Sequence, residues 1–262
     1  MKKILALVLA LALIAAVGCA SAATKLVVGA SSTPHAEILE AAEPLLEEKG
    51  IELEIVLFDD YVQPNLQLES KDLDANYFHH IPYLESFNAD NGTHLVSAGA
   101  VHYEPMGIYT NQSKLYTIDT IPDGAVIAVP NDPTNEARAL ELLQAQGLIK
   151  LDVAAGEKAT VLDIAENPKK VEVKEFEAAA VPRMLADVDL AVINSNYALQ
   201  AGVEVVGTAI AAESSEIAYP NIIAIREGDD REELKTLVEV LQSDAIVNFI
   251  KDTYGTSVVP TK

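Results

Sequence analysis

The sequence of 262 residues contains one cysteine and no tryptophan, and it has few basic residues. A single thiol excludes an intramolecular disulfide and any cysteine-based zinc or iron–sulfur cluster. Lysine and arginine number 18 against 40 aspartates and glutamates, which gives a formal net charge of −22. A surface of this charge repels nucleic acid and anionic lipid, so we exclude both as primary partners.

Sequence motifs of common enzyme classes are also missing. The chain has no G-x-S-x-G, H-E-x-x-H, P-loop or G-x-G-x-x-G pattern. Half of the residues are apolar and 22% are charged, which is an ordinary globular composition and argues against disorder. The length allows one large domain or two lobes, each with a core of its own.

The first residues have the pattern of an export signal, which we assign to residues 1–22. Lys2 and Lys3 precede an apolar run from Ile4 to Val17, and small residues follow the run. A membrane span needs about 20 apolar residues. Because the run is shorter than that, an uncleaved membrane anchor is the less favoured alternative.

Cys19 lies where the apolar run ends. The stretch Ala16-Val17-Gly18-Cys19 resembles the bacterial lipobox, in which the cysteine becomes the lipidated N-terminus of the mature protein. Two acyl chains, such as palmitate, would hold the protein at the outer face of the cell membrane. The alternative is ordinary cleavage after Ala20-Ser21-Ala22, which would release a soluble extracytoplasmic protein.

From Lys25 onward, strand-like and helix-like segments alternate, which predicts an α/β fold with mainly parallel sheets flanked by helices. Apolar or alternating runs predict strands over 25–30, 51–57, 125–129, 171–176, 190–193 and 221–225. Capped apolar stripes predict helices that begin near Ser32-Thr33-Pro34, Asn131-Asp132-Pro133, Ala178, Asp229 and Ser243.

Two β-α-β units that each begin anew with a capped helix indicate two lobes. We expect residues 24–108 and 205–262 to form lobe 1, and residues 109–204 to form lobe 2. No proline-rich or serine-rich linker separates them, so the chain is expected to cross between closely packed lobes near Glu104–Asn111 and again near Asn196–Val206.

The segment from Asn131 to Arg138 is the most informative for chemistry. It follows an apolar strand and begins a helix, where free N–H groups and the helix dipole favour an anion. Asn135 and Arg138 are three residues apart and share a helix face. An arginine fork can bind a carboxylate through two hydrogen bonds. The pattern therefore indicates a carboxylate site, and the alternative is an exposed surface helix.

Aromatic and asparagine side chains suggest the rest of a pocket. Nine of the 14 aromatic residues lie between Phe58 and Tyr116, which is typical either of an apolar pocket wall or of core rings. Asn194 and Asn196 follow a predicted buried strand, where ligand clefts of α/β proteins lie. Asn221 begins another strand. An asparagine amide offers both a donor and an acceptor, which suits an amino-acid zwitterion.

A metal site is the main alternative for the histidine-rich region. His79 and His80 are neighbours, and neighbours in a strand point to opposite faces, so they cannot both bind one ion. Only a set that the fold assembles, such as His35, His80, His102 and a carboxylate, would serve. We expect no metal and no cofactor, and we retain a metal-binding receptor as the alternative function.

Several stretches, taken together, are similar to one known family. They occur in order along nearly the whole mature chain and comprise Val28–Ser31, Pro34–Leu39, Asp60–Asn65, Asp74–Leu84, Glu104–Gly107, Pro130–Leu140, Ala191–Ala198, and Asn221 with Arg226–Gly228. In these stretches the sequence resembles the methionine-binding lipoprotein family (NlpA/MetQ type), the extracytoplasmic components of ABC importers.

The resemblance implies a two-lobed Venus-flytrap fold, a ligand in the cleft and no catalysis. It implies that Arg138 and Asn135 contact the ligand carboxylate, and that Asn196 and Asn221 contact the amino-acid end. The residues implied to surround the thioether side chain are Tyr61, Tyr77, Phe78 and His80.

The implied partners are methionine, an ABC permease and its ATPase, and we expect a monomer. The family usually has glutamine where His79 stands and glycine where Ser195 stands. These departures leave L-methionine, D-methionine and a methionyl dipeptide open as ligands. An exported hydrolase and a surface adhesin are the remaining, less favoured alternatives.

Overall fold

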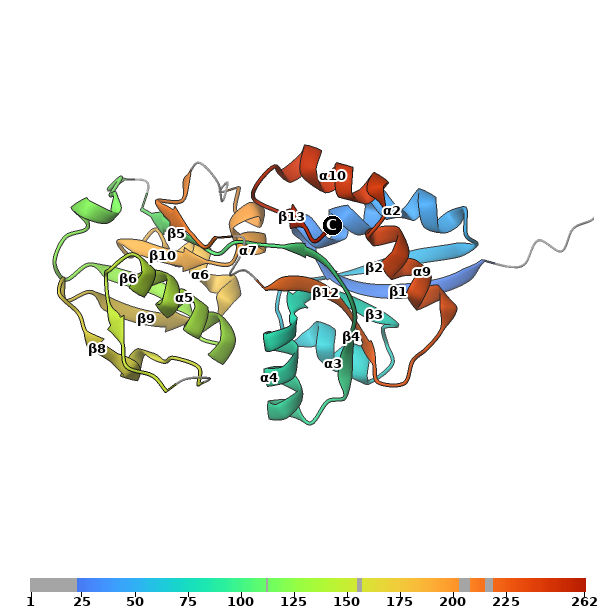
Figure 1. Ribbon diagram of the computed structural model, residues 1–262, viewed down its shortest axis with the longest axis horizontal. Helices are drawn as coiled ribbons and strands as arrows, with labels where there is room; N and C mark the ends of the chain where they lie inside the picture. The colour runs from blue at the N-terminus through green and yellow to red at the C-terminus, as the bar shows by residue number, and fades with distance from the viewer. Residues whose placement is uncertain (1–22, 112, 155–156, 203–207, 215–218) are drawn as a thin grey trace, which may run out of the picture.

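The protein folds into two lobes, each built on its own sheet (Figure 1). The computed structural model describes residues 23–111, 113–154, 157–202, 208–214 and 219–262. The expected export signal and Cys19 lie outside these ranges. Among the helices in the described ranges, none is both long enough and apolar enough to span a membrane.

The first lobe contains a six-stranded sheet in the order β13-β4-β12-β3-β1-β2. β1 is parallel to β2 and β3, whereas β12 is antiparallel to β3 and β4. The strands are β1 (Thr24–Ser31), β2 (Ile51–Phe58), β3 (Ala75–His80), β4 (Leu95–Tyr103), β12 (Pro220–Arg226) and β13 (Val259–Pro260).

Helices cover both faces of this sheet (Figure 1). One face carries α2 (Glu37–Glu47), α9 (Glu232–Leu241) and α10 (Asp244–Tyr254), and the other carries α3 (Gln63–Glu69) and α4 (Ile81–Asn91). The apolar stripe predicted for the first helix is buried, since its members pack on β1 and α9. This helix begins at Glu37 rather than at Ser32, because Thr33 has an extended backbone within the irregular turn η1 (Ser32–Ala36).

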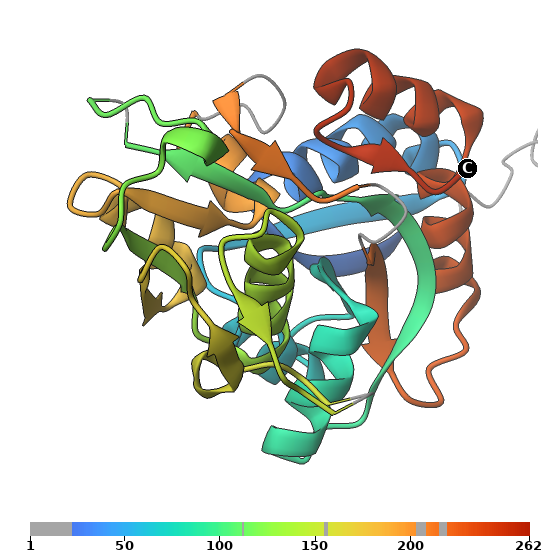
Figure 2. The same ribbon diagram turned by 60° about the vertical axis from the view of Figure 1, so that its left-hand side comes forward.

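The second lobe contains a five-stranded sheet in the order β11-β5-β10-β6-β9 (Figure 2). Its strands are β5 (Gly107–Thr110), β6 (Val126–Pro130), β9 (Glu172–Phe176), β10 (Leu190–Ile193) and β11 (Ala211–Ala212). Its longer helices are α5 (Pro133–Ala145), α6 (Val181–Met184) and α7 (Ser195–Gln200). Smaller elements are η2 (Ile118–Thr120), η3 (Val161–Asp163), η4 (Ala178–Ala180), and a two-stranded sheet of β7 (Lys150–Leu151) and β8 (Ile164–Glu166).

The α/β class and the two lobes are confirmed, but the sheets are mixed rather than mainly parallel. In the second sheet β6 is parallel to β9 and β10, whereas β5 is antiparallel to β10 and β11. The strands that lead into or out of the crossings between lobes, β4, β5, β11 and β12, each have an antiparallel neighbour. Strands that leave one sheet for another need not follow the direction of β-α-β units.

The first crossing lies within the expected stretch, whereas the return crossing comes later in the chain than expected. The first crossing spans 104–106, because β4 ends at Tyr103 and β5, which begins at Gly107, belongs to lobe 2. The return crossing follows Ala212, because Ala211 and Ala212 pair with β5. Lobe 2 therefore extends beyond the expected boundary at 204/205. A two-residue edge strand has no sequence pattern that predicts it.

The core of lobe 1 provides a stability test. Leu237 of α9 is fully buried in the core cluster that α9 shares with α2, so we expect Leu237→Ala to lower the free energy of unfolding by about 2–5 kcal/mol. The control is Leu162→Ala, since Leu162 is 90% exposed and the same truncation there should change stability by less than about 0.5 kcal/mol. Urea unfolding measures both variants, and equal effects would contradict this description of the core.

Candidate functional site

A cavity lies between the two lobes, with about 340 Å³ of empty space including the part open to solvent. Its lining consists of Tyr61, Phe78, His79, His80, Tyr83, Glu104, Asn135, Arg138, Asn194, Ser195, Asn196 and Asn221. Both lobes and the first crossing contribute to it, and seven of the eight residues predicted for the site are present.

Tyr77 is the exception, since the structure places it outside the lining. Its ring is fully buried in the core of lobe 1, with its centroid 4.7 Å from that of the His35 ring and its hydroxyl against Nδ1 of His102. Neighbouring residues of β3 point to opposite faces. Asn76 accordingly contacts Asn65 of α3, while Tyr77 turns toward the core.

Arg138 is buried at the cavity, with 6% of its surface exposed. Its fork is already occupied, because Nε and Nη2 donate to the two carboxylate oxygens of Glu213 at 3.0 and 2.5 Å. Nη2 also donates to the backbone oxygen of Glu104 at 3.2 Å. Burial opposes the charge of Arg138, but Glu213 outweighs it and raises the pKa of the guanidinium. Only Nη1, with one long contact of 3.4 Å to Asn135, has donor capacity left.

Asn135 is held in place by the predicted helix cap. Asp132 accepts from the backbone N–H of Asn135 at 3.0 Å, and its carboxylate oxygens accept from the Asn135 amide nitrogen at 3.0 and 2.9 Å. The amide oxygen faces His80 Nε2 at 3.3 Å, Asn194 Nδ2 at 2.9 Å and Arg138 Nη1. Because Asp132 holds its amide nitrogen and three neighbours surround its amide oxygen, Asn135 orients the side chains around it.

Glu104 is a lining residue that the sequence analysis did not assign to the ligand. Its carboxylate is 6% exposed, and its Oε1 lies 2.7 Å from His102 Nε2 and 3.2 Å from His35 Nε2. Burial raises the pKa of Glu104, while His35, the backbone of Asn196 and Arg138 oppose that shift. A histidine and an acid two residues apart lie on the same side of an extended chain. The spacing of His102 and Glu104 was therefore a usable signal.

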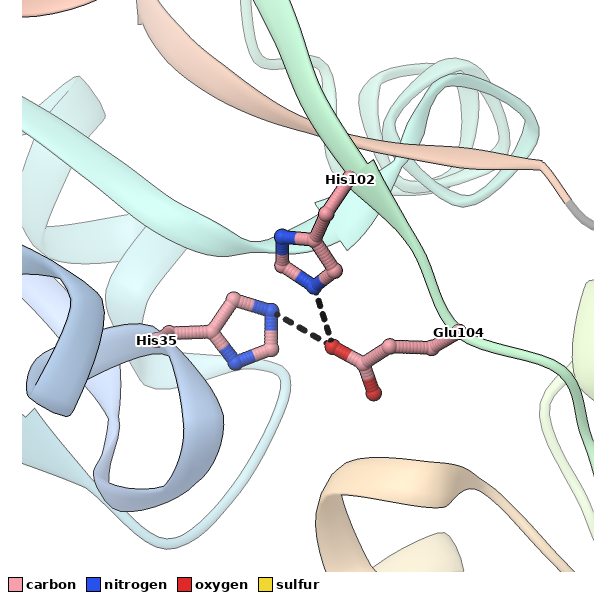
Figure 3. A group of neighbouring side chains, drawn as sticks. All are labelled: His35, His102 and Glu104. Carbon is pink, nitrogen blue, oxygen red and sulfur yellow. Dashed lines mark hydrogen bonds and ion pairs between the residues drawn. The ribbon is translucent and has the colours of Figure 1, made fainter. Parts of the chain in front are cut away.

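The histidines at the site are buried and electrically neutral near pH 7. Burial lowers the pKa of His35 to about 4 and those of His79 and His102 to about 3. Burial and the nearby Arg138 also lower the pKa of His80. The fold thus brings His35 and His102 together with Glu104, as Figure 3 shows, but it places His80 against Asn135 instead.

Besides Nδ1 of His79, two buried amide atoms in the lining have no hydrogen-bond partner within the described part of the chain. They are the amide oxygen of Asn194 and the amide nitrogen of Asn196, an acceptor and a donor. A buried polar group without a partner is costly. A small molecule that carries both a donor and an acceptor would relieve both atoms.

An aromatic wall closes one side of the cavity. The Tyr61 ring lies 5.7 Å from the rings of both Phe78 and Tyr83. Tyr61 also bridges the lobes, because its hydroxyl donates to Asn196 Oδ1 at 2.6 Å and its ring lies 4.8 Å from that of Tyr197. The two lobes therefore already touch across the cavity.

The two departures from the family pattern have visible roles. His79 Nε2 lies 3.0 Å from Asn65 Oδ1, and the Ser195 hydroxyl donates to the backbone oxygen of Pro105. Both side chains line the cavity, and Nδ1 of His79 is buried there without a hydrogen-bond partner among the described residues. Asn221 also lines it, with Oδ1 3.1 Å from His35 Nε2.

The buried ion pair of Arg138 and Glu213 gives a stability prediction. Glu213→Gln leaves a buried guanidinium without its counterion, so we expect the free energy of unfolding to fall by about 3–5 kcal/mol. The control is Glu166→Gln, which breaks an exposed pair with Lys150 and should change stability little. Chemical denaturation compares the two variants, and a harmless Glu213→Gln would show that the pair is not needed.

Comparison with known proteins matches nearly the whole sequence to the family that it resembles. The family described as NlpA lipoprotein matches residues 26–262. A methionine-binding lipoprotein, MetQ, from Bacillus subtilis is 43% identical over 249 residues, which cover 93% of this chain and 90% of the relative.

Solved structures agree with this match. A nutrient-binding protein from Burkholderia cenocepacia, bound to methionine, has a TM-score of 0.87 at 45% identity and covers 90% of this chain and 100% of its own. A periplasmic substrate-binding protein of an ABC transporter from Coxiella burnetii has a TM-score of 0.85 at 39% identity, with coverage of 90% and 100%. This chain therefore belongs to the NlpA lipoprotein family.

Proposed function

We propose that this protein is an extracytoplasmic solute-binding protein that captures methionine and delivers it to an ABC importer. The observation that carries the proposal is a cavity between two lobes that combines a buried guanidinium, a buried carboxylate and an aromatic wall. The protein binds and releases its ligand without catalysis. The methionine-bound relative from Burkholderia cenocepacia supports this function.

The two charged ends of an amino acid match two separate groups in the cavity. The ligand carboxylate accepts from Arg138 Nη1 and from the free amide nitrogen of Asn196. The ammonium donates to Glu104 and to the free amide oxygen of Asn194. Hydrogen bonds to charged partners are the strong ones, so these contacts fix the orientation of the ligand.

The thioether then lies against the aromatic wall of Tyr61, Phe78 and Tyr83, with His80 at its edge. A sulfur atom beside an aromatic ring is worth about 0.3–1.5 kcal/mol. Because lobe 1 supplies this wall and lobe 2 supplies Arg138 and Asn196, the ligand contacts both lobes. A ligand that bridges two lobes shifts the population toward the closed form. The closed form is the one presented to the permease and its ATPase, and we expect it to be monomeric.

Methionine calorimetry with two arginine variants tests the site. Arg138→Ala should weaken methionine binding by about 2–5 kcal/mol, because the carboxylate loses its charged partner. The matched control is Arg183→Ala, since Arg183 is exposed on α6 and should leave the affinity unchanged. Thermal melting checks that both variants are folded. If methionine gives no heat with the unaltered protein, or if Arg138→Ala binds as tightly, the proposal is wrong.

We also propose that Cys19 anchors the mature protein to the outer face of the cell membrane. In an exporting bacterial host, mass spectrometry should find a mature N-terminus at Cys19 that carries acyl chains. Cys19→Ser should abolish the acylation and move the protein from the membrane fraction to the soluble fraction, because two chains are needed for stable anchoring. A free N-terminus near Ala23 in the unaltered protein would favour ordinary cleavage instead.

A further inference from the structure

Three side chains of types that ligate metals converge, as Figure 3 shows, and one of them, Glu104, also lines the cavity. His35 comes from the turn before α2, His102 from β4, and Glu104 from the first crossing. One atom of each, Nε2 of the two histidines and a carboxylate oxygen of Glu104, lies within 4.8 Å of the other two. All three residues are buried, so these atoms are shielded from bulk water.

The spacing of these atoms is close to that of a tetrahedral metal site. With metal–ligand bonds of about 2.1 Å, neighbouring donor atoms lie about 3.4 Å apart. Glu104 Oε1 lies 2.7 Å from His102 Nε2 and 3.2 Å from His35 Nε2. Asn221 Oδ1 lies 3.1 Å from His35 Nε2, which provides a fourth donor. Shifts of a few tenths of an ångström would open the set around an ion.

The surroundings of the two imidazoles allow both Nε2 atoms to act as ligands. Nε2–H of His102 donates to Glu104 in the ion-free protein; when an ion takes the place of that proton, Nδ1–H can donate to the phenol oxygen of Tyr77. Nδ1 of His35 has no hydrogen-bond partner in the described part of the chain, so it can carry the ring proton once Nε2 binds an ion. Nearby, Arg138 is neutralised by Glu213, which limits its repulsion of a cation.

We propose that His35, His102 and Glu104, with Asn221 as fourth donor, form a binding site for Zn²⁺ or a similar divalent transition metal. Two imidazoles with a carboxylate and an amide oxygen suit such ions, whereas Mg²⁺ and Ca²⁺ prefer all-oxygen sites. This assignment departs from the expectation, drawn from the sequence, that the protein binds no metal. The metal-binding alternative considered from the sequence required His35, His80, His102 and a carboxylate. The structure brings His35 and His102 together with Glu104, but His80 is not part of the group.

The site also bears on ligand capture, and this part rests on the proposed function. A metal ion on Glu104 Oε1 would neutralise much of the charge that the carboxylate offers to an ammonium group, and it would repel that ammonium directly. Metal and methionine therefore bind antagonistically, and by linkage each weakens the other by the same factor.

The test is a titration of the mature protein, freed of amino acids by unfolding and refolding, with Co²⁺ and Zn²⁺ at high salt. Co²⁺ reports tetrahedral coordination through its visible ligand-field absorption, and Zn²⁺ affinity is read by competition with a chromogenic chelator. We expect one ion per chain. His102→Gln and His35→Gln should each weaken Zn²⁺ binding by at least about a hundredfold. Loss of a residue that merely hydrogen-bonds to a ligand already costs up to about a hundredfold in affinity, and these residues would be ligands themselves.

His94→Gln is the matched control, since His94 is exposed and its ring pairs with Glu69, away from the proposed site. It should bind Co²⁺ and Zn²⁺ like the unaltered protein. Mg²⁺ serves as a second control, because ions held by the acidic surface would be displaced by it and by salt. Melting curves establish that the variants are folded.

The proposal is overturned if no stoichiometric Co²⁺ or Zn²⁺ binding occurs, if Mg²⁺ displaces the bound ion, or if His102→Gln binds as tightly as His94→Gln. Because these titrations contain no amino acid, their failure is separate from a failure of methionine capture. In a second arm, saturating methionine should weaken Zn²⁺ binding at least about tenfold, and equal affinity with and without it would refute the antagonism while sparing the site.

Discussion

One buried guanidinium ties together the parts of the molecule that form the cavity. Arg138 lies on α5 of the second lobe, yet it binds the backbone of Glu104 in the first crossing and the carboxylate of Glu213 after β11, where the return crossing begins. The contact with Glu213 offsets the cost of burying the charge. Because its fork is occupied, Arg138 cannot rotate freely to meet a ligand. It offers one fixed donor, Nη1, at a position that the fold determines.

The opposite charge in the cavity is organised in the same manner. Glu104 is held by two neutral histidines, and those are held by Tyr77 and Asn221. Groups held in place before binding lose little freedom when the ligand arrives, which increases affinity without new contacts. The cavity thus separates a rigid donor end from a rigid acceptor end. That separation is the property expected of a receptor for a zwitterion, and it leaves the aromatic wall to select the side chain.

The sequence predicted those parts of the site that depend on local periodicity. Asp132, Asn135 and Arg138 follow from a helix start and a three-residue spacing, and the structure brings all three together. The partner of Arg138 lies 75 residues away, at Glu213, and no local pattern specifies such a contact. For the same reason, the two hydrogen bonds that we expected Arg138 to donate to a ligand carboxylate go to Glu213 of the protein instead.

Strand geometry explains the remaining differences. Tyr77 and Phe78 look equivalent in a list of aromatic residues, but alternation along β3 sends Tyr77 into the core of lobe 1 and leaves Phe78 in the lining. The return crossing was expected too early because β11 has only two residues and takes its place from pairing with Ile108 and Gly107. Tertiary pairing, rather than propensity, decides such short strands.

The central claim is the orientation of a methionine-like zwitterion between Arg138 and Glu104. Crystals of the mature protein grown with selenomethionine as ligand would test it most directly, because anomalous scattering locates the selenium. We predict a selenium peak beside the rings of Tyr61, Phe78 and Tyr83, with the ligand carboxylate at Arg138 Nη1 and its ammonium at Glu104. A peak outside the cavity, or a carboxylate turned away from Arg138, would contradict the account.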